Sequence, residues 1–342
     1  MTTIKDVAKL SGVSMSTVSR VMNAPESVRA DKREKVEKAI RELRYYPNAL
    51  ARGLISKRTE TLGVLIPDVS NPYVSEVIRG MEDAAHSLGS NLILCNTDRN
   101  QERMINYLKV LKEKQVDGII YTSEPFTADF HKLFEEFNMP VVLASTQSIE
   151  YEIPSVKIND EKAGYDAGMY LIRKGHYKIG MISGPIEDPI AGYTRYSGFK
   201  KAMSEILPME TIDAWIEFGS YRYEDGYEAM KRLYKKQPEV TAVFVASDEM
   251  ALGAISYLHQ IGISVPEEVS VLGFDNTKIA KMCIPKLTTI GQPMYDIGQK
   301  AVFKLEALLN SEELDELRSY LDHTIVERDS VKELSRKLYS NW

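Results

Sequence analysis

Residues 1–23 read MTTIKDVAKLSGVSMSTVSRVMN, and this stretch has the pattern of two short helices separated by a turn. Its first half carries apolar residues at helical spacing, namely Ile4, Val7, Ala8 and Leu10. Thr3 and Asp6 fit a helix-capping start, and Gly12 permits a tight turn. The second half, Met15–Asn23, has hydroxyl groups and an arginine, which suit phosphates and base edges. An ordinary pair of packed helices has the same local pattern, so the choice depends on the rest of the chain.

Charge is distributed unevenly along the chain. The 342 residues carry a net charge of −6, which by itself argues against binding to nucleic acid. The first 60 residues, however, contain 13 Lys and Arg against 7 Asp and Glu, whereas the other 282 contain 30 against 42. A basic head on an acidic body is expected of a protein that docks one end on phosphates. The charge and the helix pattern together favour a DNA-binding helix-turn-helix.

The composition indicates a globular protein of two or three domains. A hydrophobic content of 44% over this length is enough for a substantial core. No apolar run approaches the ~18 residues of a membrane span, and the first residues do not have the pattern of a signal peptide. Cys95 and Cys283 lie far apart and form no CxxC pair. We therefore expect reduced core thiols in a cytoplasmic protein.

Four segments follow from the pattern along the chain. A third helix over 31–45 completes a helix-turn-helix domain at 1–45. Residues 46–60 contain a short helical stretch that is too brief to be stable alone, and we expect a linker there. The core is expected at 61–330, and a short charged tail follows at 331–342.

The core alternates apolar strands with amphipathic helices. Strands are expected at 62–66, 92–95, 118–121, 141–144, 156–158, 179–182, 242–246, 269–274 and 324–326. Helices are expected near 72–88, 101–114, 161–174, 195–206, 224–236, 248–261 and 294–309. This alternation predicts parallel sheets covered by helices on both faces, divided between two similar lobes. Ligands of such folds bind at the carboxyl ends of the strands, which places a binding site in the cleft between the lobes.

Several ordered motifs resemble the LacI-type family of bacterial transcription regulators. They are VSRV at 18–21, YPNALARGL at 46–54, NPY at 71–73, SDEMALG at 247–253 and GFDNT at 273–277, and the resemblance runs from residue 3 to about 330. It implies an all-α helix-turn-helix DNA-binding head with a hinge helix, joined to an α/β two-lobed periplasmic-binding-protein-like core. It also implies a homodimer that binds a pseudo-palindromic DNA operator. Such a regulator would repress carbohydrate-utilisation genes under the control of a small sugar or sugar-phosphate effector.

The resemblance also assigns residues to the DNA. In the head, the DNA-facing residues are expected to be Thr3, Ser14, Met15, Ser16, Thr17, Ser19, Arg20 and Asn23. Asn48 and Arg52 are expected beside the minor groove. Leu54 is similar to the apolar lever that the family inserts into a central base step, where a wedge kinks the duplex. The ordinary alternative for Leu54 is a place in a hydrophobic core.

The effector residues implied by the resemblance are Tyr73, Arg195, Tyr221, Asp248 and Asp275. Carboxylates and a guanidinium can bond sugar hydroxyls, while an aromatic ring packs against the C–H face of a sugar. Each side chain also has a structural alternative: Arg195 could bridge helices, Asp275 could organise its turn, and Tyr221 could simply pack.

The sequence QPMYDIG at 292–298 closely resembles the catabolite control branch of the family, whose co-repressor is a serine-phosphorylated phosphocarrier protein. Acidic and aromatic positions match those that the branch uses toward this partner, namely Asp68, Asp98, Tyr295 and Asp296. The branch takes the phosphoserine with an arginine on the next helix, but this chain has Lys300 and Lys304 there. A sugar-responsive repressor is therefore the first expectation, and catabolite control is the alternative.

Other classes of protein fit less well. Nucleotide-binding, protease and hydrolase motifs are missing from the sequence, and the five histidines have no metal-ligand spacing. We therefore expect no enzyme activity, no cofactor and no metal. A transport binding protein would need an export signal and would have no use for residues 1–23. The tail lacks the long leucine heptads that make some family members tetramers, which favours a dimer.

Overall fold

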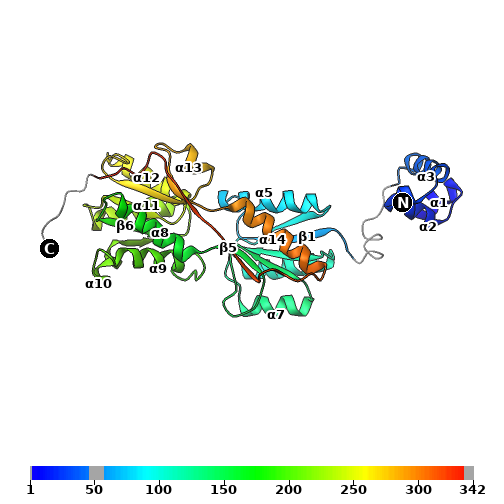
Figure 1. Cartoon of the computed structure of the whole chain (residues 1–342), viewed down its shortest axis with the longest axis horizontal. Coiled ribbons are helices and arrows are strands. Elements are labelled where there is room, and N and C mark those ends of the chain that lie inside the picture. The colour runs from blue at the N-terminus through cyan, green and yellow to red at the C-terminus, as the bar shows by residue number, and fades with distance from the viewer. Residues whose placement is uncertain (1, 46–57, 335–342) are drawn as a thin grey trace. The chain divides into compact units, whose positions relative to one another are not determined.

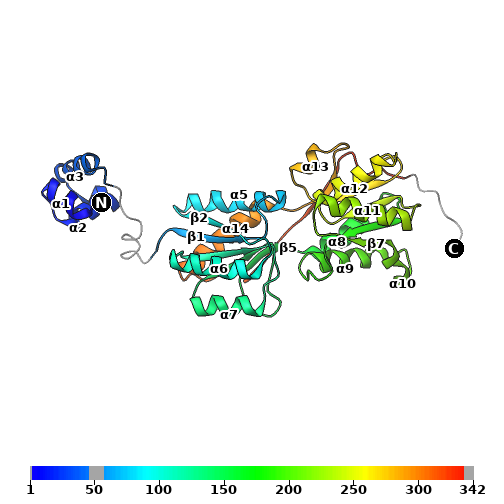
Figure 2. The same ribbon diagram turned by 180° about the vertical axis from the view of Figure 1, so that it is seen from behind.

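A computed structural model describes residues 2–45 and 58–334 (Figures 1 and 2). The chain divides into two compact units, Met1–Glu60 and Thr61–Trp342, which we call the head and the core. Among the described residues, none of the helices combines the length and apolar character that crossing a membrane requires.

The head is a small three-helix domain. It contains α1 (Ile4–Ser11), α2 (Met15–Asn23), the 3-10 turn η1 (Pro25–Ser27) and α3 (Ala30–Leu43). These helices enclose a compact apolar cluster of Val7, Ala8, Val18, Val21, Val36 and Ala39. The Asp6 carboxylate accepts hydrogen bonds from the backbone N–H and the hydroxyl of Thr3, each at 2.8 Å, and so fixes the start of α1. Gly12 ends α1 in the left-handed region with φ 67°.

One apolar position of the head differs from the expected pattern. Leu10 is 47% exposed, whereas the next residue, Ser11, is buried. The Ser11 hydroxyl donates a hydrogen bond to the Val7 carbonyl at 2.6 Å, so it is satisfied inside the domain. Leu10 therefore belongs to the surface of α1, although its spacing suggested a core position.

The N-lobe of the core is a six-stranded parallel sheet in the order β11-β5-β4-β3-β1-β2. Its strands are β1 (Thr61–Ile66), β2 (Asn91–Asn96), β3 (Gly118–Thr122), β4 (Val141–Ala144), β5 (Ser155–Ile158) and β11 (Arg318–Leu321). Its helices are α5 (Pro72–Ser87), α6 (Gln101–Glu113), α7 (Ala128–Phe137) and α14 (Met294–Leu309). α5 and α14 pack together on one face, and α6 and α7 lie on the other (Figures 1 and 2).

The C-lobe has a second six-stranded sheet in the order β12-β10-β9-β8-β6-β7, parallel except for β12. Its strands are β6 (Ile179–Ser183), β7 (Ile216–Phe218), β8 (Ala242–Val245), β9 (Ser270–Asp275), β10 (Thr288–Gly291) and β12 (Thr324–Val326). Its helices are α8 (Asp160–Arg173), α9 (Gly192–Met203), α10 (Met209–Ile212), α11 (Tyr223–Lys236), α12 (Asp248–Gln260) and α13 (Lys278–Met282), with the 3-10 turn η2 (Asp213–Trp215). α8 packs with α9, and α11 packs with α12.

The chain crosses between the lobes three times. The crossings lie between β5 and α8, between β10 and α14, and between β11 and β12. Because the strands of both sheets end near these crossings, the carboxyl ends of the two sheets face one another. This arrangement agrees with the predicted two-lobed core.

The structure contains elements that the sequence pattern did not predict. The additional strands are β7, β10 and β11, and the additional helices are α7, α10 and α13. β7 has three residues, and β11 (RSYL) is half polar, so neither has a clear apolar run. α9 also begins earlier than expected, at Gly192 instead of residue 195.

Two glycines allow α8 and α9 to approach closely. A Cβ atom on Gly164 would lie 2.3 Å from the Arg195 carbonyl oxygen, and one on Gly198 would lie 1.9 Å from the Glu161 carbonyl oxygen. Only hydrogen fits at either place. The pair therefore fixes the position of α9, which carries Arg195 into the cleft.

Candidate functional site

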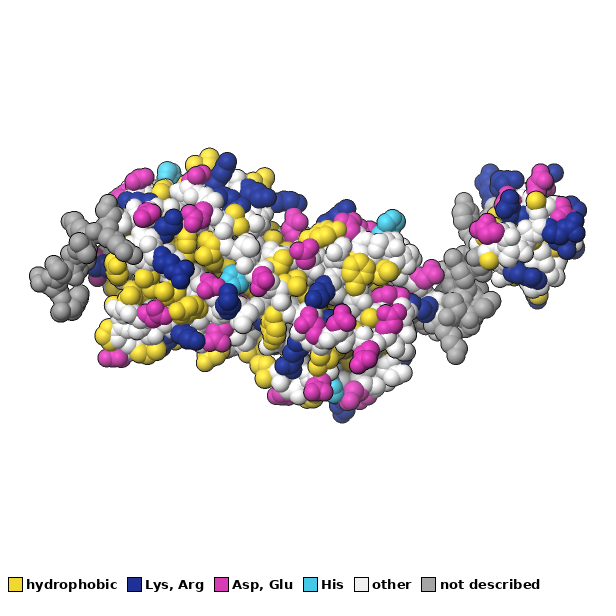
Figure 3. All heavy atoms as spheres, viewed as in Figure 1, with side chains coloured by type: hydrophobic (Ala, Val, Ile, Leu, Met, Phe, Trp, Pro, Cys, Tyr) yellow, Lys and Arg dark blue, Asp and Glu magenta, His cyan; other side chains and the backbone are white. Residues whose placement is uncertain are grey.

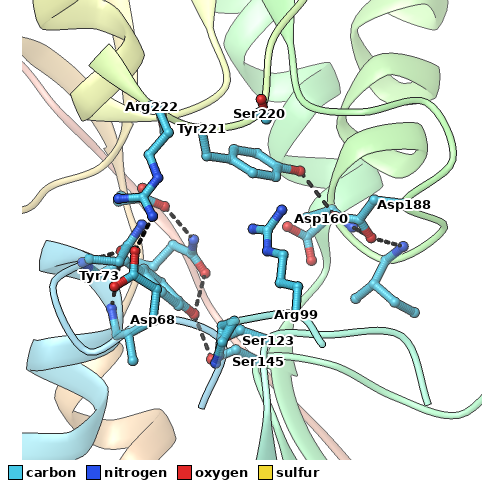
Figure 4. Close-up of a pocket in the computed structure, with 18 of the residues that line it drawn as sticks. Asp68, Tyr73, Arg99, Ser123, Ser145, Asp160, Asp188, Ser220, Tyr221 and Arg222 are labelled. Atoms are coloured by element: carbon cyan, nitrogen blue, oxygen red, sulfur yellow. Dashed lines mark hydrogen bonds and ion pairs between the residues drawn. The ribbon is translucent and has the colours of Figure 1, made fainter. Parts of the chain in front are cut away.

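A cavity of about 400 Å³ lies between the two lobes of the core. Its lining comes from loops that follow the carboxyl ends of strands in both sheets, from the first turns of α5 and α9, and from Lys157, Asp160 and Gln292 beside two of the crossings. Figure 4 shows part of this lining. The volume is within the range of pockets that hold one small molecule. We call this cavity the cleft.

Backbone strain is concentrated in the cleft. Six of its lining residues are not glycine and yet have positive φ angles between 53° and 112°, namely Asp98, Arg99, Ser123, Ser145, Tyr221 and Asp275. Such conformations cost free energy and persist where the surrounding structure imposes them, often at binding sites. Both lobes contribute, so the strain marks the cleft as a whole.

A buried group of three charges forms one wall of the cleft. Asp160 accepts from Arg195 Nε and from Lys157 Nζ, each at 2.8 Å. The three side chains are only 4–8% exposed. Burial by itself would raise the pKa of Asp160, but Lys157 and Arg195 hold that pKa below its ordinary value. Asp160 is therefore ionised and holds two cations at the edge of the cavity.

Arg195 is fixed by more than this ion pair. Its Nη1 donates to the Ala246 carbonyl at 2.9 Å, and its guanidinium carbon lies 3.8 Å from the ring centroid of Phe274. Burial opposes its charge, but the ionised Asp160 raises its pKa above the ordinary value. Arg195 is thus a permanent cation with a fixed orientation.

Asp275 lies opposite this cation, at the end of β9. One of its oxygens accepts from Gln292 Nε2 at 2.7 Å. Burial raises the pKa of Asp275 well above its ordinary value, although Arg195 partly opposes that shift. The environment therefore favours a neutral carboxyl group, which can donate as well as accept a hydrogen bond.

Two tyrosines complete the walls of the cleft. The Tyr73 hydroxyl donates to Ser145 Oγ at 2.7 Å, and the Tyr221 hydroxyl donates to Asp188 Oδ2 at 3.1 Å (Figure 4). Burial raises the pKa of both phenols, so both are neutral donors. Their rings provide apolar surface beside the charged groups.

Four of the five predicted effector residues line the cleft: Tyr73, Arg195, Tyr221 and Asp275. The residues that the sequence reasoning missed include Arg99, Ser123, Ser145, Lys157, Asp160 and Asp188. Most of these follow the carboxyl end of a strand, directly or within a short loop. A search of those positions in the predicted strands could have found several of them, because parallel sheets bind ligands there.

Asp248 is the exception and requires a correction. It is buried and does not line the cleft. One oxygen accepts from the Thr277 backbone N–H at 2.7 Å and from its hydroxyl at 3.0 Å, and the other accepts from the Thr289 hydroxyl at 2.7 Å. Burial raises its pKa to about 6. Asp248 thus holds the loop that follows β9 against strand β10. Both of its carboxylate oxygens are occupied by these bonds inside the C-lobe.

The four predicted partner-protein residues lie in two places. Asp68 and Asp98 line the cleft, where Asp68 pairs with Arg222 of the other lobe. Tyr295 and Asp296 are exposed in the first turn of α14, and the Tyr295 hydroxyl donates to Asp83 Oδ2 at 3.1 Å.

The candidate DNA-facing residues gather on α2 and the residues just before it. Ser14 caps α2 by accepting from the Thr17 backbone N–H at 3.2 Å. Thr3, Ser14, Met15, Ser16 and Arg20 are exposed, and Thr17 and Ser19 are half-buried. Residues 2–45 contain ten Lys and Arg against six Asp and Glu, and Figure 3 shows several of these basic side chains on the head. The opposite side of α2 is held by Val18 and Val21 in the apolar cluster.

Some predictions fall outside what the structure describes. Asn48, Arg52 and Leu54 lie outside the described residues, as does most of the predicted tail, and Asn23 is described only as the last residue of α2. Within residues 2–45 and 58–334, no group of three or more His, Cys, Asp or Glu side chains is arranged to hold a metal ion.

Comparison with known proteins gives consistent matches over most of the chain. Residues 3–48 match the family described as bacterial regulatory proteins, lacI family, and residues 59–324 match periplasmic binding proteins and sugar binding domain of LacI family. Catabolite control protein A from Priestia megaterium is 43% identical over 331 residues, which cover 96% of this chain and 99% of the relative.

Solved structures support the same relationship. The lac repressor dimer bound to operator and the anti-inducer ONPF matches with a TM-score of 0.86 and 28% identity, over 97% of this chain and 99% of that one. The transcriptional regulator CelR in its cellobiose complex matches with a TM-score of 0.74 and 28% identity, over 96% of this chain and all of that one.

Proposed function

The chain belongs to the LacI family of bacterial transcriptional regulators, and we propose that it represses carbohydrate-utilisation genes under the control of a carbohydrate bound in the cleft. The observation that carries this proposal is the cavity of about 400 Å³ between the lobes, with charged and aromatic groups on its walls. Effector binding there changes the relative stability of lobe orientations and thereby the affinity of the heads for the operator.

The chemistry of the cleft supports a carbohydrate. Arg195 and Asp275 present hydrogen-bonding groups from the C-lobe. The two hydrogen bonds that fix Arg195 use its Nε and Nη1 atoms and leave Nη2 for a ligand. Tyr73 and Tyr221 add rings against which the C–H face of a sugar can pack. The similarity to a regulator solved with cellobiose points in the same direction. Tyr73, Arg195, Tyr221 and Asp275 are therefore the proposed effector contacts.

The head is proposed to read the operator through α2. Its hydroxyls and Arg20 are proposed to contact phosphates and base edges, while Asn48, Arg52 and Leu54 act in the minor groove. A homodimer would place two heads on the half-sites of a pseudo-palindrome, and the similarity to the operator-bound lac repressor dimer supports this arrangement. Such a regulator would act in the cytoplasm, where the operator lies, and its relatives are regulators rather than enzymes.

The proposal is tested in two steps with the full-length protein. Selection from random double-stranded DNA is expected to recover a two-fold symmetric site. Fluorescence anisotropy with that site then measures operator affinity with and without D-glucose, cellobiose or glucose 6-phosphate. At least one of these is expected to change the affinity about 5- to 150-fold, the usual range of allosteric coupling. Recovery of no symmetric site, or operator affinity that none of the three alters, would contradict the proposal.

A second candidate function is catabolite control with a phosphorylated phosphocarrier protein as co-repressor. The 43% identity to catabolite control protein A favours it, as does the exposed start of α14 with Tyr295 and Asp296. The lysines of α14, however, are engaged: Lys300 pairs with Glu316 at 3.1 Å, and Lys304 donates to the carbonyls of Glu316 and Leu317. Titration with phosphorylated and plain phosphocarrier protein separates the two functions, because only the second predicts tight binding of the phosphorylated form alone.

A further inference from the structure

Arg99 is a cation of the cleft that belongs to none of the predicted sites. It follows β2 in the N-lobe, with φ 56°, and its guanidinium carbon lies 6.0 Å from the ring centroid of Tyr221 in the C-lobe. In Figure 4, its side chain extends toward that ring, into the space between the lobes. The residue is exposed, so the water of the cleft solvates its charge. A positive charge therefore lies where a small ligand would bind.

The other cations of the cleft are paired. Lys157 and Arg195 share the carboxylate of Asp160, and Arg222 pairs with Asp68. Arg99 differs from them, because across residues 2–45 and 58–334 no carboxylate lies within 4.0 Å of its nitrogen atoms. Arg99 thus retains its capacity to bind an anion.

The neighbouring carboxylates are already engaged. Asp98 is adjacent to Arg99 in the sequence but pairs with Arg103. Asp188 accepts from the Tyr221 hydroxyl and from two backbone N–H groups. Both carboxylates therefore already have partners in the structure, and neither is in ion-pair contact with Arg99.

Two further carboxyl groups are poor partners for a different reason. Burial raises the pKa of Asp275 well above its ordinary value, which favours the uncharged form. Burial also raises the pKa of Glu124, and the Thr97 hydroxyl donates to it at 3.1 Å. Arg99 lowers the pKa of Glu124 electrostatically, although the two side chains form no ion pair. Among the described residues, Arg99 therefore has no carboxylate in ion-pair contact, although it interacts with Glu124 over a longer distance.

A ligand that fills the cleft would displace the water around Arg99. A cation that loses water without gaining a negative partner is costly, whereas pairing with an anion recovers that cost. A guanidinium binds phosphate and carboxylate groups through parallel hydrogen bonds. We infer that the effector of this protein is an anionic carbohydrate, whose phosphate or carboxylate group pairs with Arg99. This inference rests on the proposed function, because it assumes a carbohydrate in the cleft.

The test is calorimetric titration of the full-length protein with D-glucose, glucose 6-phosphate and D-glucuronate. The last two separate a phosphate from a carboxylate as the anionic group. At least one of them is expected to bind about ten- to a hundredfold more tightly than glucose, the range for a charge-assisted hydrogen-bonded pair. Added NaCl should reduce this advantage.

Variants assign the advantage to one side chain. Arg99→Gln should remove most of the preference for the anion and lower glucose affinity much less, and Arg99→Lys should retain part of the preference because it keeps the charge without the fork. Arg79→Gln is the matched control, since Arg79 is 64% exposed on α5, pairs with Asp83 and lies outside the cleft. It makes the same change in net charge and should leave the preference intact.

The possible outcomes are distinct. If glucose binds as tightly as both anions, or if Arg99→Gln keeps the preference, the inference is overturned while a carbohydrate effector still stands. If none of the three compounds binds to the wild-type protein, the inference is overturned. The proposed carbohydrate effector then fails as well only if cellobiose also leaves operator affinity unchanged.

Discussion

Replacement of Asp160 by asparagine tests how the cleft is held together. Asp160 carries the negative charge in the buried group that it forms with Lys157 and Arg195, and it pairs with each of them at 2.8 Å. Asparagine keeps the shape of the side chain but removes the charge. Two cations, 5% and 8% exposed, would then lie side by side without a counter-ion.

The expected loss is large because the partners remain buried. Removal of one member of a buried ion pair typically costs about 3–5 kcal/mol of unfolding free energy. For a unit of this size, that loss corresponds to a fall in melting temperature of about 6–20 °C. Effector affinity should also fall, since Asp160 orients Arg195 toward the cavity.

The effect should depend on pH in a defined direction. The folded-state pKa of Asp160 lies below its ordinary value because Lys157 and Arg195 outweigh the effect of burial. Its stabilising contribution is therefore complete above the ordinary pKa of about 4 and is lost as the pH falls through the lowered folded value. The difference in stability between wild type and Asp160→Asn should be widest near neutral pH and should shrink in acid.

The assay is thermal and urea unfolding of both proteins at several pH values, with Asp296→Asn as control. Asp296 is exposed on α14, and its replacement should change the unfolding free energy by less than about 0.5 kcal/mol. If Asp160→Asn is as stable as this control at pH 7, the three charges do not act as a unit, and the reasoning is wrong.

Three further substitutions test other parts of the structure. Gly164→Ala should lower the unfolding free energy by about 1–3 kcal/mol, measured by urea titration, because its Cβ would lie 2.3 Å from the Arg195 carbonyl oxygen. Asp275→Asn should be more stable than wild type at pH 8 but not at pH 4. The reason is that the raised pKa of Asp275 makes the wild-type protein lose stability as the pH rises. Equal melting temperatures of the two proteins at pH 8 would refute this prediction. Leu54→Ala should weaken operator binding in a gel-shift titration with effector binding retained, and unchanged operator affinity would remove Leu54 from the DNA contacts.

Most of the architecture could be predicted from the sequence because its helices and strands have strong local patterns. The spacing of Val7, Val18 and Val21 predicted a packed head, and the apolar runs before the cleft loops predicted most strands of both sheets. β7 and β11 were missed because they are short or half polar, and their strand conformation depends on the neighbouring strands that they extend.

The residues of the cleft could be predicted only in part, and the reasons are physical. Arg195 and Asp275 belong to recognisable motifs, but nothing local in the sequence indicates that Asp160 pairs with Arg195, 35 residues away along the chain. Asp248 belongs to an equally clear motif and yet turns into the lobe, because the hydroxyls of Thr277 and Thr289 lie within reach there. The direction in which a polar side chain points depends on tertiary neighbours, and the sequence pattern does not contain them.

A ligand in the cleft is proposed to set the affinity of the heads for DNA. The most direct measurement is the affinity for the selected operator as a function of glucose 6-phosphate, D-glucose or cellobiose concentration, for wild type and for Arg195→Ala. The expected result is a saturable change in operator affinity for wild type with at least one of these compounds, and no change for Arg195→Ala, whose affinity without ligand stays near that of wild type. An identical response of the two proteins would contradict the claim that the effector acts through this cleft.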